Sequence, residues 1–194
     1  FLSKSKSNKI IYQKGKIVGH NFILKKNKWN VKLINTGKST MTGGRIAKIK
    51  KYLDISDENF CLTYGDGISD INISKLIKFH NKQKLLATVL AVRPPSRFGS
   101  LTIKNKKVTN FSEKNKNSQS LINGGFFILS KMIFKFIKNS STVFEEYPLK
   151  KLASLGQLGS YYHTGYWMPM DTLREKKLIE KYIKDNKDKL TTWF

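Results

Sequence analysis

The chain has 194 residues, of which 39% are hydrophobic and 12% aromatic, a balance that can bury a core and is unlike that of a disordered chain. Lysine and arginine together number 37 against 13 acidic residues, which gives a formal net charge of +24. The longest apolar runs, such as residues 85–92, fall far short of the roughly 20 residues of a membrane-spanning helix, so we do not expect an integral membrane protein.

The positive charge has two interpretations. A polyanion such as nucleic acid is the first partner to consider for so basic a chain. However, only four of the 37 basic residues are arginine, the residue that nucleic-acid recognition favours. Lysine, asparagine and isoleucine, all abundant here, share A/T-rich codons, and the lysines are scattered without interleaved aromatic residues. We therefore expect solvated lysine faces and no nucleic-acid partner.

The start of the chain and its cysteine content bear on its origin and compartment. The chain begins Phe1-Leu2-Ser3-Lys4, with no initiator methionine and no apolar segment that could serve as a secretory signal. This start indicates a piece of a longer reading frame. The single cysteine, Cys61, cannot form an internal disulfide or a cysteine-rich metal site, so a reducing, cytoplasmic setting is the simplest expectation.

The first third of the chain predicts short strands followed by a helix. Strands are expected at residues 10–12, 21–24 and 29–34, separated by turns. After a turn-rich stretch, Ile46, Ile49 and Leu53 recur at the spacing of one helix face.

A strand, a helix and a strand then follow in sequence. Residues 59–64 predict a buried strand that contains Cys61, residues 73–80 predict a helix, and the run 85–92 predicts a second buried strand that ends before Pro94-Pro95. Such a crossover predicts a parallel sheet with a right-handed connection.

The second half predicts a hairpin inserted into that sheet, then further strands and helices. In chain order these are hairpin strands at 100–103 and 108–111, a buried strand at 122–129, a short helix at 132–137, a helix at 145–155, a strand at 160–163 and a helix at 172–184. Asp171 or Thr172 is expected to cap the last helix. Pro148 falls in the first turn of the helix predicted at 145–155. Residues 1–194 are thus predicted to form a single α/β domain with a Rossmann-like, mixed and mainly parallel sheet flanked by helices.

Two aspartates stand where a ligand could bind. Gly65-Asp66-Gly67 places a carboxylate at the carboxyl end of a buried strand, between glycines that let a ligand approach the backbone. A plain tight turn has the same pattern, and Asp171 could equally be a simple helix cap. Together, two carboxylates at two sheet-edge turns suit a Mg²⁺ ion that carries substrate phosphates.

Three further segments are candidates for binding. The amides of Thr42-Gly43-Gly44-Arg45, just before a helix, could face an anion or a nucleotide base, or form a simple turn with a solvent-facing arginine. Lys114, at the end of a hairpin strand, could meet a phosphate or be one more surface lysine. Asn123-Gly124 could read sugar hydroxyls or mark a strained strand entry. No Ser/His/Asp or Cys/His set is recognisable among three histidines and one cysteine, which argues against nucleophilic catalysis and zinc.

These motifs, in this order, resemble the sugar nucleotidyltransferase superfamily, and within it the cytidylyltransferases that act on glucose 1-phosphate. The resemblance rests on residues 29–37, 39–45, 63–67, 97–99, 122–127, 165–174 and 192–193. It implies a nucleotide-diphospho-sugar transferase fold and a Mg²⁺-dependent transfer of CMP from CTP to α-D-glucose 1-phosphate, giving CDP-glucose and pyrophosphate. The product would be a precursor for deoxysugar, O-antigen or other lipopolysaccharide synthesis, and the full-length enzyme would be a homo-oligomer.

The resemblance also implies residue roles. The implied catalytic residues are Asp66 and Asp171, which would hold the Mg²⁺, and Lys114, which would contact the sugar phosphate. The implied substrate-binding residues, around the nucleotide and the glucose, are Thr42, Gly44, Arg45, Gly65, Asn123 and Gly124.

The chain departs from the superfamily pattern in two places. Superfamily members begin with a strand and a Gly-Gly-x-Gly-Thr-Arg loop, followed by a Lys-Pro, and nothing in this sequence matches either, so about two βα units are expected to be missing and the chain alone to be inactive. Relatives also usually have a proline after the lysine where this chain has Asn115. A relative that uses another nucleotide or sugar phosphate, a basic nucleic-acid-binding module and an inactive remnant are the competing interpretations.

Overall fold

The computed structural model of the chain describes residues 6–13, 16–24, 29–54, 56–95, 100–104, 106–112 and 120–186. The chain divides into two compact units: unit 1 comprises residues 1–57, 132–151 and 194, and unit 2 comprises residues 58–131 and 152–193. Lys114 and the segment 97–99 lie outside the described residues, as do residues 192–193. Among the helices of the described ranges, none has the length and apolar character needed to cross a membrane.

Unit 1 contains an antiparallel sheet of three strands, in agreement with the three strands predicted there. In the order β1-β2-β3, the strands are β1 (Lys6–Gln13), β2 (Lys16–Leu24) and β3 (Trp29–Ile34). The sheet is followed by helix α1 (Thr42–Ile49) and the 3₁₀ turn η2 (Lys50–Tyr52). Ile46 is buried in α1 as the spacing predicts, whereas Leu53 lies beyond the end of both helical segments.

Unit 2 is built on a four-stranded sheet in the order β10-β6-β9-β4. The strands are β4 (Asn59–Thr63), β6 (Ala87–Val92), β9 (Ile122–Ser130) and β10 (Leu158–His163). β10 pairs parallel with β6, and β9 runs antiparallel to both of its neighbours, so three of the four strands share one direction. The α/β class and the mixed sheet are confirmed.

The strand pairing adds one detail to the predicted sheet and departs from it in another. β4 and β6 point the same way but are not neighbours, because β9, buried continuously from Gly124 to Leu129, takes the place between them. A strand apolar on both faces is best covered when strands flank both of its edges and other elements cover its faces. The hairpin strands β7 (Ser100–Lys104) and β8 (Lys107–Ser112) form their own two-stranded sheet instead of joining the four-stranded one.

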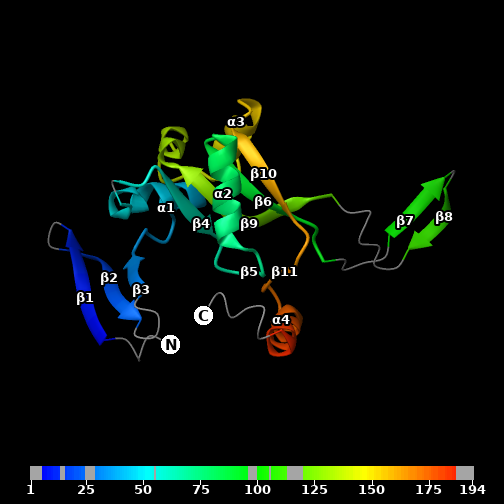
Figure 1. Cartoon of the computed structure of the whole chain (residues 1–194), viewed down its shortest axis with the longest axis horizontal. Helices are drawn as coiled ribbons and strands as arrows, with labels where there is room; N and C mark the ends of the chain where they lie inside the picture. The colour runs from blue at the N-terminus through cyan, green and yellow to red at the C-terminus, as the bar shows by residue number, and fades with distance from the viewer. Residues whose placement is uncertain are drawn as a thin grey trace. The chain divides into compact units, whose positions relative to one another are not determined.

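Helix α2 (Ile73–Gln83) covers one face of this sheet and lies across β6, β9 and β10 in Figure 1. Leu76, fully buried, belongs to a core cluster on the sheet side of the helix. The other buried members of that cluster are Ile71, Leu90, Val92, Phe126 and Ile128. Each fully buried side chain of this kind contributes roughly 1.5–3 kcal/mol relative to exposure.

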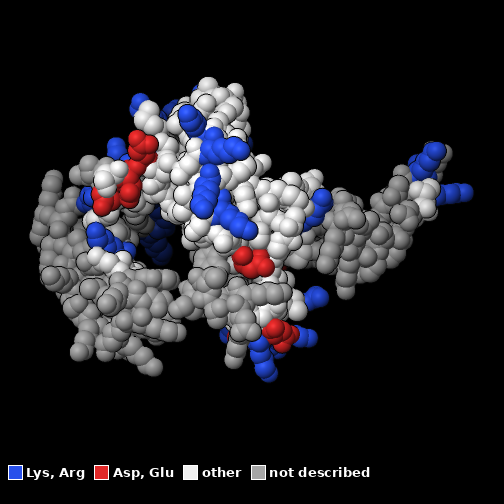
Figure 2. Space-filling view, in the orientation of Figure 1, with Lys and Arg blue, Asp and Glu red and all other residues white. Residues whose placement is uncertain are grey.

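The outer face of α2 is basic. Lys75, Lys78 and Lys82 are all exposed, and their spacing puts them on one side of the helix. Figure 2 shows the resulting column of blue side chains over α2. For this helix, the expectation of solvated lysine faces is confirmed.

Cys61 is exposed, contrary to the prediction that it lies in a buried strand. β4 stands at the end of the sheet order, and within the described residues it pairs with β9 alone. Along this edge strand the alternate residues Cys61 and Thr63 face solvent. The apolar run therefore identified the strand correctly but overestimated its burial.

The remaining elements are shorter strands, helices and a 3₁₀ turn in the two units. They are the short strands β5 (Gly67–Ser69) and β11 (Trp167–Pro169), the helices α3 (Tyr147–Ser154) and α4 (Leu173–Asp185), and the 3₁₀ turn η3 (Lys131–Phe136). Pro148 is the second residue of α3, where its missing N–H costs nothing. Thr172, and not Asp171, is the N-cap of α4, and with Glu175 it forms a capping box.

Candidate functional site

The two aspartates predicted to bind metal lie at the same end of a short two-stranded ribbon in unit 2. β5 and β11 pair antiparallel from Gly67 opposite Pro169 to Ser69 opposite Trp167. Asp66 directly precedes β5, and Asp171 follows β11 by two residues. The amide of Met170 donates a hydrogen bond of 2.8 Å to the carbonyl of Asp66, so the chain reaches Asp171 one residue after this contact.

The chemistry of this pair fits a magnesium ion shared with phosphates. Both aspartates are exposed, and carboxylate oxygens are the ligands that Mg²⁺ takes one or two at a time, leaving its other positions to phosphate and water. In the described part of the chain, no group of three or more His, Cys, Asp or Glu side chains could by itself hold a metal. Asp66 and Asp171 therefore suit a substrate-bound cation better than a structural metal.

The start of β9 is joined to both strands of the ribbon. The Asn123 amide donates to the Tyr64 hydroxyl at 3.3 Å, and Tyr64 lies two residues before Asp66. The indole N–H of Trp167, which lies four residues before Asp171, donates to the carbonyl of Gly124 at 2.7 Å. Four of the predicted site residues, Asp66, Asp171, Asn123 and Gly124, are thus gathered in one region of unit 2.

The glycines of β9 have a structural explanation of their own. Gly125 has a φ of +77°, and a Cβ there would lie 2.9 Å from the Tyr64 ring. A Cβ on Gly124 would lie 3.0 Å from the Val92 side chain. Asn123 Oδ1 accepts from the Gly125 amide at 2.8 Å, which closes the turn at the strand entry. The glycines thus serve close packing, and contact of Asn123 and Gly124 with a sugar stays a prediction.

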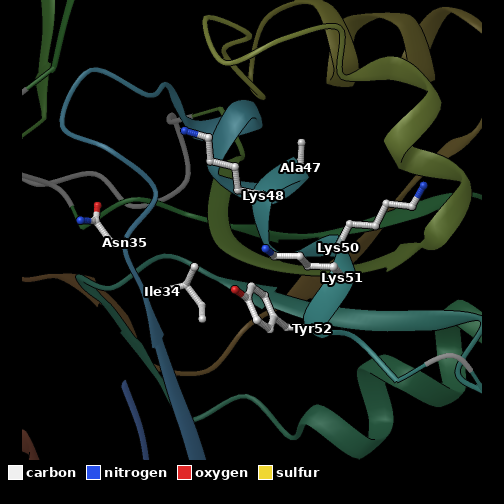
Figure 3. Close-up of a pocket in the computed structure, with 7 residues that line it drawn as sticks. All are labelled: Ile34, Asn35, Ala47, Lys48, Lys50, Lys51 and Tyr52. Atoms are coloured by element: carbon white, nitrogen blue, oxygen red, sulfur yellow. The ribbon is translucent and has the colours of Figure 1, made fainter. Parts of the chain in front are cut away.

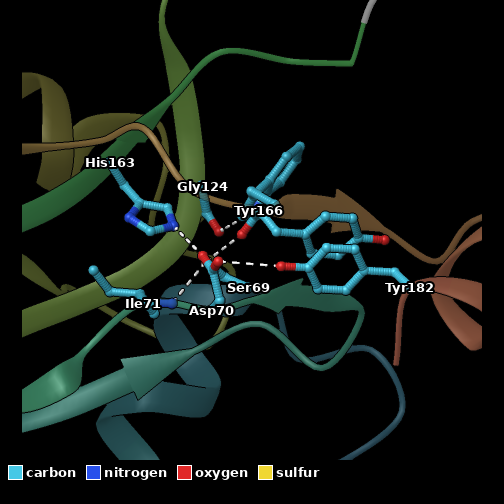
Figure 4. Close-up of polar contacts among 8 residues, drawn as sticks. Ser69, Asp70, Ile71, Gly124, His163, Tyr166 and Tyr182 are labelled. Carbon is cyan, nitrogen blue, oxygen red and sulfur yellow. Dashed lines mark hydrogen bonds and ion pairs between the residues drawn. The ribbon is translucent and has the colours of Figure 1, made fainter. Parts of the chain in front are cut away.

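Asp70, at the other end of the ribbon, is the centre of a polar cluster that the sequence did not reveal. Its Oδ1 lies 2.8 Å from His163 Nε2, and its Oδ2 accepts from the Tyr182 hydroxyl at 3.2 Å. Figure 4 shows the two partners approaching Asp70 from opposite sides. His163 and Tyr182 are 93 and 112 residues away in sequence, so no local spacing signalled the cluster.

Neighbouring contacts define the chemistry of this cluster. The Tyr182 ring stacks on Tyr166 with centroids 3.6 Å apart, and burial, with the charge of Asp70 and the hydrogen bond to it, raises the pKa of Tyr182. The phenol therefore stays protonated and donates to Asp70. Ser69 Oγ donates to the Tyr166 carbonyl at 2.9 Å and not to His163, so the cluster is not a nucleophilic triad.

The candidate residues Thr42, Gly44 and Arg45 lie in unit 1, where α1 begins against the loop 139–145. The Gly44 amide donates to the Thr142 carbonyl at 3.3 Å. Thr42 Oγ1 donates to the Glu145 carboxylate at 2.7 Å and accepts from the Phe144 amide at 2.8 Å. The Arg45 guanidinium bonds Thr36 Oγ1 and the Lys38 carbonyl. Protein contacts therefore account for this segment locally, and its place around a nucleotide stays a prediction.

A cavity of about 660 Å³ lies beside the same helix in unit 1. Figure 3 shows its lining, which comes from the end of β3 and from α1 and η2: Ile34, Asn35, Ala47, Lys48, Lys50, Lys51 and Tyr52. Lys48 Nζ bonds the Thr36 carbonyl and Thr40 Oγ1, while Lys50 and Lys51 lie over aromatic rings. The cavity holds none of the predicted site residues.

Comparisons with known proteins agree with this architecture. Residues 5–181 match the family model described as nucleotidyl transferase. The chain is 44% identical over 165 residues to glucose-1-phosphate cytidylyltransferase of Salmonella typhimurium, which covers 85% of the chain and 64% of that protein. It is 40% identical over 166 residues to the probable glucose-1-phosphate cytidylyltransferase of Bacillus subtilis, with the same coverage of 85% and 64%. The chain thus spans about 64% of the length of these curated relatives.

Solved structures show the same fold. HddC from Yersinia pseudotuberculosis superposes with a TM-score of 0.59 at 26% identity, over 81% of this chain and 70% of that chain. A putative glucose-1-phosphate thymidylyltransferase from Bacillus anthracis superposes with a TM-score of 0.56 at 20% identity, over 77% of this chain and 63% of that one. At 20% identity, the similarity to the Bacillus anthracis structure shows the fold alone.

Proposed function

The chain belongs to the nucleotidyl transferase family, and from this premise we propose that the protein transfers CMP from CTP to α-D-glucose 1-phosphate. The observation that carries the proposal is the pairing of Asp66 and Asp171 at one end of the β5–β11 ribbon, beside Asn123. The similarity to two curated cytidylyltransferases over 85% of the chain supports the choice of nucleotide and sugar.

The proposed reaction is an in-line displacement. A phosphate oxygen of glucose 1-phosphate forms a bond to the α-phosphorus of CTP, the bond from that phosphorus to the oxygen bridging the β-phosphate breaks, and pyrophosphate leaves with the electron pair. Both reactants are anions, so positioning and charge neutralisation are the main demands on the protein. A bound Mg²⁺ would neutralise phosphate charge and orient the triphosphate.

The chain's own residues would divide these tasks. Asp66 and Asp171 would hold the metal with the phosphates at the ribbon end. Asn123, with the Tyr64 hydroxyl beside it, would offer hydrogen bonds to glucose hydroxyls. Lys114 would meet the sugar phosphate, and Thr42, Gly44 and Arg45 would lie around the nucleotide.

The test is an assay of the protein expressed from the longest reading frame that contains this sequence. With CTP, glucose 1-phosphate and MgCl₂, we expect CDP-glucose and pyrophosphate in equal amounts, measured by ³¹P NMR. A panel of ATP, GTP, UTP and dTTP, each with glucose 1-phosphate and mannose 1-phosphate, should give rates at least about tenfold lower, because a site that hydrogen-bonds its substrate rejects one lacking those groups. A faster rate with another pair would assign the protein to a different branch of the family.

Variants tie the activity to the ribbon end. Asp66→Asn and Asp171→Asn should each lower kcat by about 100-fold or more, in line with the loss of a major electrostatic contribution. Asp185→Asn, which removes an exposed carboxylate at the far end of α4, is the matched control and should leave the rate unchanged. Full activity of both site variants would overturn the proposed role of these two carboxylates, whereas an inactive wild type would support the interpretation as a basic binding module or a remnant.

A further inference from the structure

The ribbon that carries Asp66 and Asp171 is too short to be rigid by itself. Each of its strands has only three residues. Isolated two-stranded ribbons are marginally stable in water even when they are longer. The distance between the two aspartates therefore depends also on the contacts that join the ribbon to its neighbours, including those at its other end.

Asp70 joins three elements at that other end. Its amide donates to the Tyr166 carbonyl at 3.1 Å, directly beyond the last ladder pair of the ribbon. Its carboxylate bonds His163, the last residue of β10, and Tyr182, in the second half of α4. The side chains of Asp70 and His163 are only 23% and 12% exposed, so water competes little for this contact.

The chain is shaped to permit this contact. A Cβ on Gly165 would lie 2.3 Å from Asp70 Oδ1 and 2.7 Å from the His163 ring. Only glycine leaves room for the pair at that point of the β10–β11 connection. The approach of Asp70 to His163 thus depends on a specific residue of the segment that leads to Asp171.

Helix α4 connects the two ends of the ribbon a second time. At its start, Glu175 accepts hydrogen bonds from the amides of Asp171 and Thr172, each at 3.0 Å. From Thr172 to Tyr182 the helix rises about 15 Å, at 1.5 Å per residue. The extended chain from Asp66 to Asp70 spans about 13 Å, at roughly 3.3 Å per residue. The helix and the ribbon are therefore matched in length and fastened at both ends.

We propose that the Asp70 clamp, meaning Asp70 with its partners His163 and Tyr182, positions Asp171 against Asp66 and so sets the affinity of the site for a divalent cation. This inference rests on the proposed function, because it takes Asp66 and Asp171 to be the metal ligands. The clamp residues do not touch the metal and act as positioning residues.

The alternative roles of Asp70 make distinct predictions. If Asp70 only attracts cations by its charge, Asp70→Asn would weaken binding as much as Asp70→Ala, and His163→Ala would not weaken it. If the clamp only stabilises the fold, all three variants would lower stability while the folded protein kept its cation affinity.

The experiment is a Mn²⁺ titration of the purified protein by EPR, with thermal unfolding of each variant recorded beside it. Asp70→Ala and His163→Ala should raise the Kd for Mn²⁺ by about threefold to tenfold, below the roughly 10–100-fold typical of residues bonded directly to a metal ligand, because the clamp acts on the aspartates through the ribbon. Asp70→Asn, which still accepts from His163 and can bond the Tyr182 hydroxyl, should stay within about twofold of the wild type. Leu129→Val, a buried core variant outside the cluster that contains Ile71 and packs against Trp167, should lower stability without changing the Kd.

The outcomes separate this inference from the function on which it rests. Wild-type Mn²⁺ binding that is lost in Asp66→Asn but unchanged in Asp70→Ala and His163→Ala would overturn the clamp and leave the metal site standing. If Asp70→Asn bound Mn²⁺ as weakly as Asp70→Ala does, the positioning role would also be overturned, and the negative charge of Asp70 would account for its effect. No Mn²⁺ binding by the wild type, or binding unaffected by Asp66→Asn, would overturn the metal site itself.

Discussion

Gly44 shows at the scale of one residue why a glycine stands inside helix α1. Alanine is favoured over glycine in a helix by about 1 kcal/mol, so helix propensity alone predicts that Gly44→Ala stabilises the protein. A Cβ at this position would lie 2.5 Å from the carbonyl oxygen of Ser140. That backbone cannot swing away as a flexible side chain could.

We therefore expect Gly44→Ala to lower the free energy of unfolding by up to about 2 kcal/mol, the usual overpacking cost of about 1–3 kcal/mol less a gain in propensity of about 1 kcal/mol. Urea denaturation of both proteins measures the difference. Gly65→Ala is the control, because no atom lies within 4 Å of a Cβ there and its effect should stay within about 0.5 kcal/mol. A stabilised Gly44→Ala protein would show that the loop 139–145 does not pack on α1.

The candidate site could be predicted from the sequence only where its residues are signalled locally. Asp66 and Asp171 are predicted to belong to it because each stands at a turn beside a strand or a helix. Asp70 and His163 carry no such signal, since their contact spans 93 residues and depends on how β10 and β5 come together. The Thr42–Arg45 segment was recognised from its glycines, yet the sequence could not show that the loop 139–145 lies against them.

At the scale of elements, α2 is joined to β6 through a buried polar pair. His80 Nδ1 lies 2.9 Å from Thr88 Oγ1, and both residues are buried, with exposed fractions of 2% and 0%. Burial lowers the pKa of His80 below its ordinary value of 6.5, because the charged ring would lose its hydration. The imidazole is therefore neutral in the folded protein.

Because the pKa of His80 is lower in the folded protein, folding stability decreases as the pH falls below 6.5. Above pH 6.5 both the folded and the unfolded chain hold a neutral His80, so the group contributes nothing to the pH dependence. Below that pH the unfolded chain takes up a proton that the folded chain does not, and stability falls as the pH drops. We expect the His80 Cε1–H resonance to titrate with a midpoint below 6.5, and His80→Gln to remove part of the stability loss between pH 7 and 5. A midpoint at or above 6.5 would contradict the buried neutral ring.

The elements themselves were largely predictable, whereas their pairing was not. Period and turn residues located β4, α2, β6, β9 and α4 to within a few residues, because these signals act over one element. The place of β9 between β4 and β6, and the exposure of Cys61, are decided by segments far apart in the chain. The match to the nucleotidyl transferase family model and the likeness to the two solved structures confirm the predicted fold type.

The whole molecule carries a charge that its fold does not neutralise. The formal net charge is +24, and two of the ion pairs between lysine and glutamate, Lys150–Glu146 and Lys176–Glu180, join exposed side chains four residues apart. Such pairs contribute little to stability. Repulsion among lysines then destabilises the compact state, and salt screens it, because the Debye length falls from about 30 Å at 0.01 M to about 10 Å at 0.1 M.

We expect the melting temperature of the protein to rise by about 2–4 °C between 0.01 and 0.3 M NaCl, equivalent to about 1 kcal/mol for a chain of this size. Changing Lys75, Lys78 and Lys82 on the outer face of α2 to glutamine lowers the net charge from +24 to +21 and should make the rise smaller. Differential scanning calorimetry over the salt series measures both. A melting temperature that falls as salt is added would contradict this prediction, and so would a melting temperature that rises more steeply in the triple variant than in the wild type. Either result would show that these lysines form favourable charge pairs and do not mainly repel one another.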